Sequence, residues 1–136
     1  MQRTLARVSR LILVDGQDQQ YLQLLEEPES GEGRKLTMVI GRSAAEEIQK
    51  CLKRTEDPRP MTHELAYGLL QRLSGEIREM VIHQLDQGTY FAELRVEKDG
   101  EVFGVDCRPS DGIALSLRGA ADIYVTESVW DQAAEG

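Results

Sequence analysis

The chain has 136 residues, of which 40% are hydrophobic and 29% are charged, the ordinary composition of one globular domain. Sixteen basic against 24 acidic residues give a formal net charge of −8, and such a surface repels a polyanion unless a local basic patch or bound cations intervene. No apolar run approaches the length of a signal-peptide core or a membrane span, and the two cysteines fit no metal-binding spacing. We therefore expect a cytoplasmic protein with reduced thiols that does not enter a membrane.

The first half of the sequence predicts three strands followed by two helices. Aliphatic and β-branched residues, separated by a turn at Asp15-Gly16 and by a polar loop, predict strands over 7–14, 21–26 and 36–40. Ser43, with Glu46 three residues later, predicts a capping box at the start of the first helix. Thr62 is the predicted cap of the second helix. The buried face of that helix is expected to consist of Leu65, Ala66, Leu69, Leu70 and Leu73.

The second half repeats this order of elements. Strands are predicted over 80–85, 90–97 and 101–107, because apolar and polar residues alternate with period two and Asp99-Gly100 marks a hairpin turn. Ser110 is the predicted cap of a short helix. A short strand over 123–125 and a helical turn over 127–134 follow.

The repeated order predicts an α+β fold, in which a three-strand, two-helix unit is duplicated around a mixed, mostly antiparallel sheet. The strand-to-helix corners at 41–43 and 107–110 are the matching landmarks of the two halves. Because no long linker separates the halves, we expect them to share one core. The prediction is a single domain over 1–136, with its core at about 8–133.

The densest polar cluster runs from Asp106 to Asp111, where a predicted strand ends and a helix begins. Helix N-termini offer free N–H groups and a partial positive charge, which suit phosphates and other anions, and Arg108 could donate two hydrogen bonds to a phosphate. A structural role explains the same residues equally well. Ser110 is a good cap, Asp111 favours the helix dipole, and Arg108 can pair with Asp106 or Asp111.

A second polar cluster, at 58–64, places His63 and Glu64 in the first turn of a helix beside Arg59. His63 could act as a general base or bind a metal, and Glu64 could bind a divalent cation. The plainer interpretation is a helix capped by Thr62, in which Glu64 favours the helix dipole and His63 packs or caps. A lone histidine at a helix start more often has such a structural role.

Together the two clusters resemble the bifunctional nuclease (BFN) domain family. Residues 59–65 (RPMTHEL) are similar to the family pattern R-P-x-T-H-D-L, and residues 106–116 (DCRPSDGIALS) to D-A-R-P-S-D-A-I-A-L-A. The resemblance covers roughly 8–133. It implies an intracellular domain with nuclease activity on DNA and RNA, a duplicated fold like the one predicted above, and a tendency to self-associate.

The sequence departs from the family pattern at several positions. Ala44 stands where the family usually has Glu, which removes a carboxylate from the first corner and argues against a metal site there. Glu64 replaces Asp and keeps a carboxylate with a longer reach. Cys107, Gly112 and Ser116 replace alanines, and glycine inside a helix costs up to about 1 kcal/mol relative to alanine.

The function that these residues predict is a phosphodiesterase acting on DNA, RNA or both. Glu64, Asp106 and Asp111 are the predicted ligands of one or two divalent cations, Mg²⁺ or Mn²⁺, which would offset the acidic surface and activate water. His63 is the predicted general base or acid. The predicted catalytic residues are His63, Glu64, Asp106 and Asp111, and the predicted substrate-binding residues are Arg59, Arg108 and Ser110.

Two other functions are compatible with the sequence. One is a non-catalytic domain that works through homo-oligomerisation or by binding a small anionic ligand, and the charge of −8 without a Lys-rich stripe favours it. The other is an acid–base enzyme on a small molecule with Asp106 and His63 as the pair. That function ranks lowest, because no cofactor-binding loop such as G-x-G-x-x-G is present.

Overall fold

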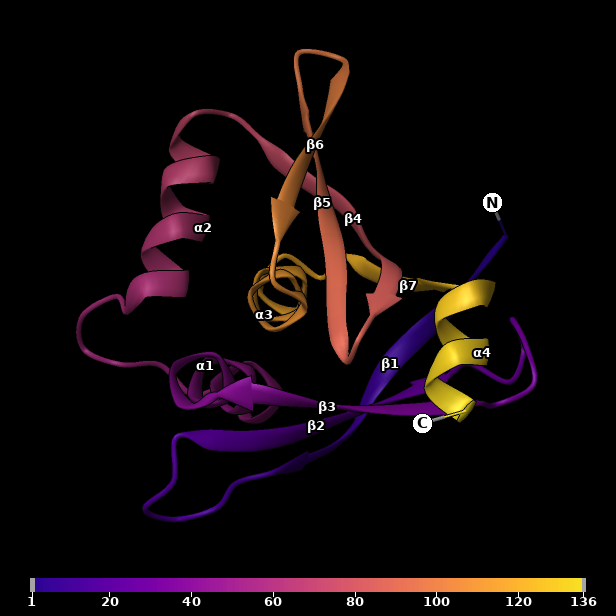
Figure 1. Cartoon of the computed structure of the whole chain (residues 1–136). Helices are drawn as coiled ribbons and strands as arrows, with labels where there is room; N and C mark the ends of the chain where they lie inside the picture. Colours follow the sequence, from indigo (N-terminus) through magenta and orange to yellow (C-terminus); the bar gives the residue numbers. More distant parts are fainter. Residues whose placement is uncertain (1, 136) are drawn as a thin grey trace.

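The computed structural model describes residues 2–135, without the side chain of residue 135, and these residues form an α+β fold of four helices and a seven-stranded mixed sheet (Figure 1). The predicted domain limits at 1 and 136 lie outside the described residues. The elements are β1 (Arg3–Ile12), β2 (Gln19–Glu26), β3 (Lys35–Gly41), α1 (Arg42–Lys53), α2 (Thr62–Arg72), β4 (Glu76–Asp86), β5 (Thr89–Lys98), β6 (Glu101–Cys107), α3 (Pro109–Arg118), β7 (Asp122–Thr126) and α4 (Glu127–Glu135).

The sheet has the strand order β3-β2-β1-β7-β4-β5-β6. Two antiparallel meanders, β1–β2–β3 and β4–β5–β6, are joined through β7, which pairs antiparallel with β1 and parallel with β4. Figure 1 shows the sheet curled, so that the edge strand β3 passes near α3 and the β4–β5 hairpin. The α+β prediction is confirmed. The internal duplication is not, because β7 separates α3 from α4 and nothing matches it between α1 and α2.

The core lies inside the curl of the sheet and is closed by α1, α3 and α4. Period-two alternation sets one face of each central strand inward, as predicted for β5, where Ala92 and Leu94 are buried. The helices contribute apolar side chains to the same cluster. Its largest fully buried apolar members are Leu22, Leu24, Ile48, Met80, Ile82, Ile113, Val125, Val129 and Trp130. Within the described part of the chain, no helix is both long and apolar enough to cross a bilayer. The cytoplasmic location stays a prediction.

Three predicted helix caps are wrong. The cap residues are Gly41, Met61 and Arg108, and the predicted serine or threonine lies one or two residues further on, inside the first helical turn. In α1 and α3 no side chain caps the N-terminus, whereas in α2 the Glu64 carboxylate accepts a hydrogen bond from the Met61 N–H at 3.1 Å. The first N–H groups of α1 and α3 are therefore left without a side-chain partner.

The predicted buried stripe of α2 is also wrong. No residue of α2 is buried, and Leu65, Leu69 and Leu73 are 55%, 56% and 67% exposed. Figure 1 shows the physical reason: α2 stands off from the sheet, beside α3. The edge strand β6 is exposed on both faces as well, at Val102, Phe103 and Val105. We call these six residues the exposed apolar residues of α2 and β6.

A buried carboxylate fastens the start of the chain to β2 and α4. Glu26 is fully buried and accepts hydrogen bonds from Arg34 Nη2 at 2.8 Å and from Thr4 Oγ1 at 2.5 Å, while Trp130 donates to the same Thr4 oxygen at 2.8 Å. A Cβ atom at Gly31 would collide with this carboxylate, so a glycine is required there. The Arg34 guanidinium lowers the pKa of Glu26 from 4.5 to about 2, although burial opposes the shift.

This network predicts a pH-dependent stability. Glu26→Gln is expected to lower the free energy of unfolding by about 3 kcal/mol at neutral pH, because Arg34 loses its buried carboxylate partner. The pKa of Glu26 is lower in the folded than in the unfolded chain, so its contribution is present above about pH 4.5 and is lost as the pH falls toward 2. Urea unfolding should show the gap between wild type and variant narrowing from about pH 6 to about pH 3. A constant gap would contradict the assignment.

Candidate functional site

The corner between β6 and α3 positions the first part of the candidate site. β6 ends at Cys107, Arg108 is extended with φ −69° and ψ 142°, and Pro109 opens the helix at its first turn. Proline suits this position, because its fixed φ fits a helix and the N–H that it lacks would have no partner inside the helix. The carboxylate of Asp111 and the guanidinium of Arg108 consequently lie at the same end of α3.

The structure brings three predicted site residues together at this end of α3. His63 Nε2 lies 2.8 Å from Asp111 Oδ1, and Arg108 Nε donates to Asp111 Oδ2 at 2.8 Å. Burial raises the pKa of Asp111, but the hydrogen bonds from Arg108 and His63 outweigh it and hold the pKa below its usual range. Asp111 is therefore an ionised carboxylate that orients a histidine. A base and the group that orients it have this arrangement in hydrolytic sites.

Glu64 forms salt bridges with basic side chains of α1 and α3. Its Oε1 lies 2.7 Å from Lys50 Nζ, and its Oε2 lies 3.8 Å from Arg118. Lys50 also contacts Asp57 at 2.6 Å and the buried Glu47 at 3.0 Å, so one ammonium joins α1 to α2. The hydrogen bond from Lys50 lowers the pKa of Glu64, against the effect of burial. The carboxylate predicted to bind metal thus ties α2 to α1.

Asp106 and Arg59 lie apart from the histidine. Asp106 is exposed on β6, paired in register with Glu93, and Arg59 is exposed in the segment between α1 and α2. Among residues 2–134 neither side chain forms a hydrogen bond or a salt bridge. Of the two carboxylates predicted as partners of Arg108, it is Asp111 that fills this role.

The predicted metal ligands are not gathered into one group. In the part of the chain that the structure describes, no three side chains from His, Cys, Asp and Glu are arranged to hold an ion. Glu64 faces Lys50, and Asp111 is held between His63 and Arg108, as described above. Because Glu64, Asp106 and Asp111 do not form a ready ligand set, we assign no catalytic step to a metal.

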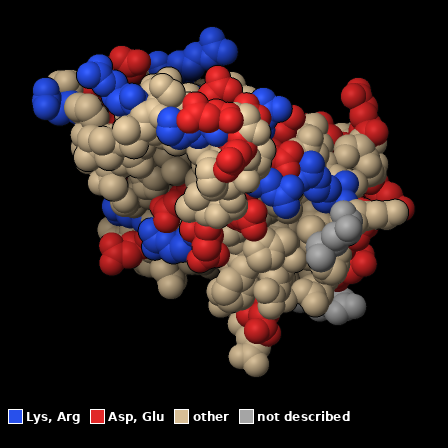
Figure 2. Space-filling model, turned by 90° about the horizontal axis from the view of Figure 1, so that it is seen from above, with Lys and Arg blue, Asp and Glu red and all other residues tan. Residues whose placement is uncertain are grey.

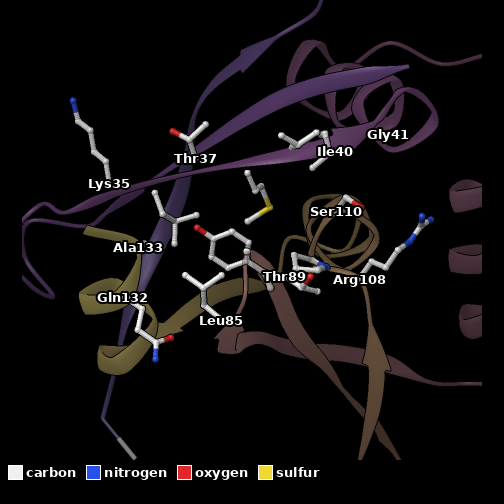
Figure 3. A pocket seen from close by; sticks show the side chains of 16 residues that line it. Lys35, Thr37, Ile40, Gly41, Leu85, Thr89, Arg108, Ser110, Gln132 and Ala133 are labelled. Atoms are coloured by element: carbon white, nitrogen blue, oxygen red, sulfur yellow. The ribbon is translucent and has the colours of Figure 1, made fainter. Parts of the chain in front are cut away.

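Sequence reasoning missed two hollows that open beside the N-terminus of α3. The β3–α3 hollow, of about 770 Å³, runs along β3 past the β4–β5 turn to α3 (Figure 3), and its walls include Met38, Ile40, Leu85, Tyr90, Arg108 and Ser110. The α1–α3 hollow, of about 400 Å³, lies between the N-termini of the two helices and shares Gly41, Arg108 and Ser110 with the first. The matching corners at 41–43 and 107–110 were the available signal, but only the folded chain places them face to face.

Surface charge around these features is mixed. Figure 2 shows acidic side chains beside basic ones over the face seen from above, without a continuous basic area. Salt bridges such as those described above, and that of Arg3 with Glu79, neutralise part of the surface charge. That face thus offers no continuous basic patch of the kind that a polyanion would need. Arg108, at the candidate site, is a well-exposed single arginine, with a side chain 78% exposed.

The chain belongs to the bifunctional nuclease domain family, which it matches over residues 23–135. Two curated relatives, from two strains of Mycobacterium tuberculosis, are each 37% identical to it over 105 residues, which is 77% of this chain and 62% of the relative. Both are named only as uncharacterized proteins. The chain thus spans about three fifths of the length of these relatives.

The structure explains two departures from the family pattern as one compensated change. A Cβ atom at Gly112 would lie 2.9 Å from Cys107 Sγ and 3.0 Å from the Met80 methyl group, so the larger Cys107 requires the smaller residue at 112. Burial raises the pKa of Cys107 to about 11, with Asp106 and Asp111 adding to the effect, so its thiol is protonated at neutral pH. Cys107 is therefore a packing residue and not an activated nucleophile.

This pairing predicts a non-additive double mutant. Gly112→Ala alone is expected to lower the free energy of unfolding by about 1–3 kcal/mol, because the added methyl group overpacks against Cys107. In a Cys107→Ala background the same substitution should cost less, because the contact with Cys107 Sγ is gone, only the contact with Met80 remains, and alanine favours the helix by about 1 kcal/mol. Urea unfolding of the wild type, both single variants and the double variant measures the coupling. Strictly additive effects would show that the two positions do not compensate.

Proposed function

We propose that this domain hydrolyses phosphodiester bonds in DNA, RNA or both, with His63 as general base, Asp111 orienting it and Arg108 binding the phosphate. The observation that carries the proposal is the pair of 2.8 Å contacts that Asp111 makes with His63 and with Arg108. Membership of the bifunctional nuclease domain family supports the class of reaction.

The geometry suggests how these residues would divide the work. When His63 donates its Nε2–H to Asp111, its Nδ1 carries the lone pair that accepts a proton from the attacking water. The imidazolium that forms is stabilised by the ionised Asp111. Arg108 uses Nε for Asp111, so its two Nη groups remain to hold the charge that develops on the phosphate oxygens. The uncapped N-terminus of α3 adds N–H groups that also carry partial positive charge.

The substrate and cofactor predictions extend this proposal. Asp106, exposed two residues before Arg108, would bind a Mg²⁺ or Mn²⁺ ion together with substrate phosphates, because Mg²⁺ in proteins commonly has only one or two carboxylate ligands. Such an ion would neutralise charge where the net −8 surface meets a polyanion. Activity measured with EDTA and after Mg²⁺ or Mn²⁺ is restored tests this part separately from the histidine.

The decisive experiment removes the base and its orienting carboxylate. His63→Ala and Asp111→Asn are each expected to lower kcat on single-stranded DNA and RNA by about 100-fold or more, because general-base catalysis contributes that much. The measurement is the release of acid-soluble nucleotides, with melting temperatures recorded to confirm folding.

Matched variants control for contaminating host nucleases. His83→Ala removes the other histidine and Asp99→Asn changes a carboxylate in the β5–β6 turn, and both should retain full activity after identical purification. If His63→Ala digests nucleic acid as fast as His83→Ala, the assignment of the base is wrong.

A second candidate function, self-association, is supported by a separate observation. The exposed apolar residues of α2 and β6 lie on an edge strand with one unpaired side and on a helix without buried residues. Edge strands with apolar side chains tend to pair with another chain unless they are covered. We propose a second copy of this chain as the partner, with β6 pairing along its free edge.

Light scattering coupled to gel filtration tests this proposal. The wild-type mass is expected to be a multiple of 15.3 kDa, and Phe103→Glu or Leu69→Glu should shift it toward the monomer, because a buried unpaired charge disfavours the interface. Ile12→Glu, at an exposed apolar residue of β1, should leave the mass unchanged. A wild-type mass of 15.3 kDa at all concentrations would contradict the proposal.

A further inference from the structure

Two helix N-termini converge on one hollow. The α1–α3 hollow is lined by Gly41, Arg42 and Ser43 at the start of α1 and by Arg108 and Ser110 at the start of α3. Neither helix has a side-chain cap, and α1 has no acidic residue in its first turn. The first N–H groups of α1 are therefore free to donate, as are those of Ser110 and Asp111 in α3, where Pro109 has none. Both helix dipoles add positive potential there.

A mostly buried serine presents its hydroxyl to the same place. Ser110 is only 7% exposed, and within residues 2–134 its hydroxyl has no hydrogen-bond partner. It lines both hollows, and Figure 3 shows it on the side of α3 that faces β3. The hydroxyl opens onto the hollows without a protein partner, so it can donate a hydrogen bond to a ligand oxygen there.

The charges around the α1–α3 hollow are partly neutralised among themselves. Arg42 donates to the carbonyl oxygens of Val14 at 3.1 Å and Gln17 at 2.5 Å, which fixes its guanidinium at the rim. Asp18 and Glu46 also line the hollow, and Glu46 lies 3.9 Å from Arg42. The buried Ala44, where the family usually has Glu, keeps a third carboxylate out. Arg108 is likewise paired with Asp111 at 2.8 Å, so the partial positive charge of the two helix N-termini is what favours an anion in this hollow.

The adjoining β3–α3 hollow differs in character. Met38, Ile40, Leu85 and Tyr90 give it apolar walls, and its volume of about 770 Å³ lies within the range of small-ligand sites. It joins the α1–α3 hollow at Gly41, Arg108 and Ser110. An anionic group at the helix N-termini would thus be followed directly by an apolar group beside Tyr90. A phosphate joined to a nucleobase has this combination of chemistry.

We propose that the two hollows together form a subsite for one nucleotide. The phosphate lies between the N-termini of α1 and α3 and accepts a hydrogen bond from Ser110, and the base lies against Tyr90. The inference rests on the proposed function, because it assigns one residue of the substrate to a place beside Arg108. A base that enters the hollow has left any duplex, so the subsite selects unpaired nucleotides.

Binding of adenosine 5′-monophosphate to the full chain tests the subsite apart from catalysis, because this probe contains no phosphodiester bond to cleave. Its addition should shift the amide resonances of Ser43 and Ser110, and calorimetry should give the affinity. Ser110→Ala is expected to weaken binding about 10-fold, the effect of losing a hydrogen bond to a charged group. Ser128→Ala, at an exposed serine on α4, is the matched control and should bind as wild type does.

Inorganic phosphate and the Tyr90→Leu variant separate the two halves of the subsite. Phosphate should shift the same two amides more weakly, and Tyr90→Leu should weaken the nucleotide but not phosphate. Tyr21→Leu, at an exposed tyrosine on β2, controls for the loss of an aromatic ring, and melting temperatures confirm that each variant folds.

Each outcome bears on the proposal. Nucleotide shifts away from Ser43 and Ser110, no binding, or equal affinity in Ser110→Ala and Ser128→Ala would overturn it. Phosphate binding as tightly as the nucleotide would overturn the base half. Binding as expected in a protein that cleaves no nucleic acid would support the subsite and refute the nuclease proposal, whereas cleavage without these shifts would refute the subsite alone.

Discussion

Helix α2 is held in place by charged and polar contacts, and the candidate site depends on them. None of its residues is buried, so the hydrophobic effect contributes little to its position. Glu64 binds Lys50 at 2.7 Å, and His63 binds Asp111 at 2.8 Å. Lys50 in turn contacts the buried Glu47, and these contacts raise the pKa of Lys50 above its usual range, although burial, the largest single influence, opposes the shift. The geometry of the histidine therefore depends on a cluster of ion pairs.

The rest of the candidate site lies on α3, which packs into the core. α3 contributes Ile113 and Ala114 to the core, and its close packing on β4 is visible in the fit of Gly112 beside Met80. Arg108 and Ser110 are consequently fixed relative to the sheet, and the two hollows share that fixed wall. The candidate base comes from the loosely packed helix, while the groups proposed to bind phosphate come from the helix that packs into the core.

The sequence predicted most of the fold and only part of the site. Strand positions followed from period-two alternation, which is a local property of the chain. The caps at Ser43 and Ser110 were wrong because each helix begins two residues earlier than composition suggests. The prediction that one face of α2 is buried was wrong, because periodicity shows that a face is apolar but not what covers it. The contact of His63 with Asp111 joins residues 48 apart, a distance that spacing alone cannot reveal; the role of Glu64 as a tie to Lys50 was hidden for the same reason.

The attachment of α2 makes the histidine sensitive to the medium. Dissolved salt screens charges over a Debye length of about 8 Å at physiological ionic strength. It weakens the pair of Lys50 and Glu64 only in part, because these side chains are 15% and 14% exposed, but it does not weaken the apolar core. Higher ionic strength would then loosen α2 before it melts the sheet, and His63 would leave Asp111 in a molecule that is otherwise intact. A partner that clamps α2 from outside would oppose this loosening, so that assembly and alignment of the base are thermodynamically linked.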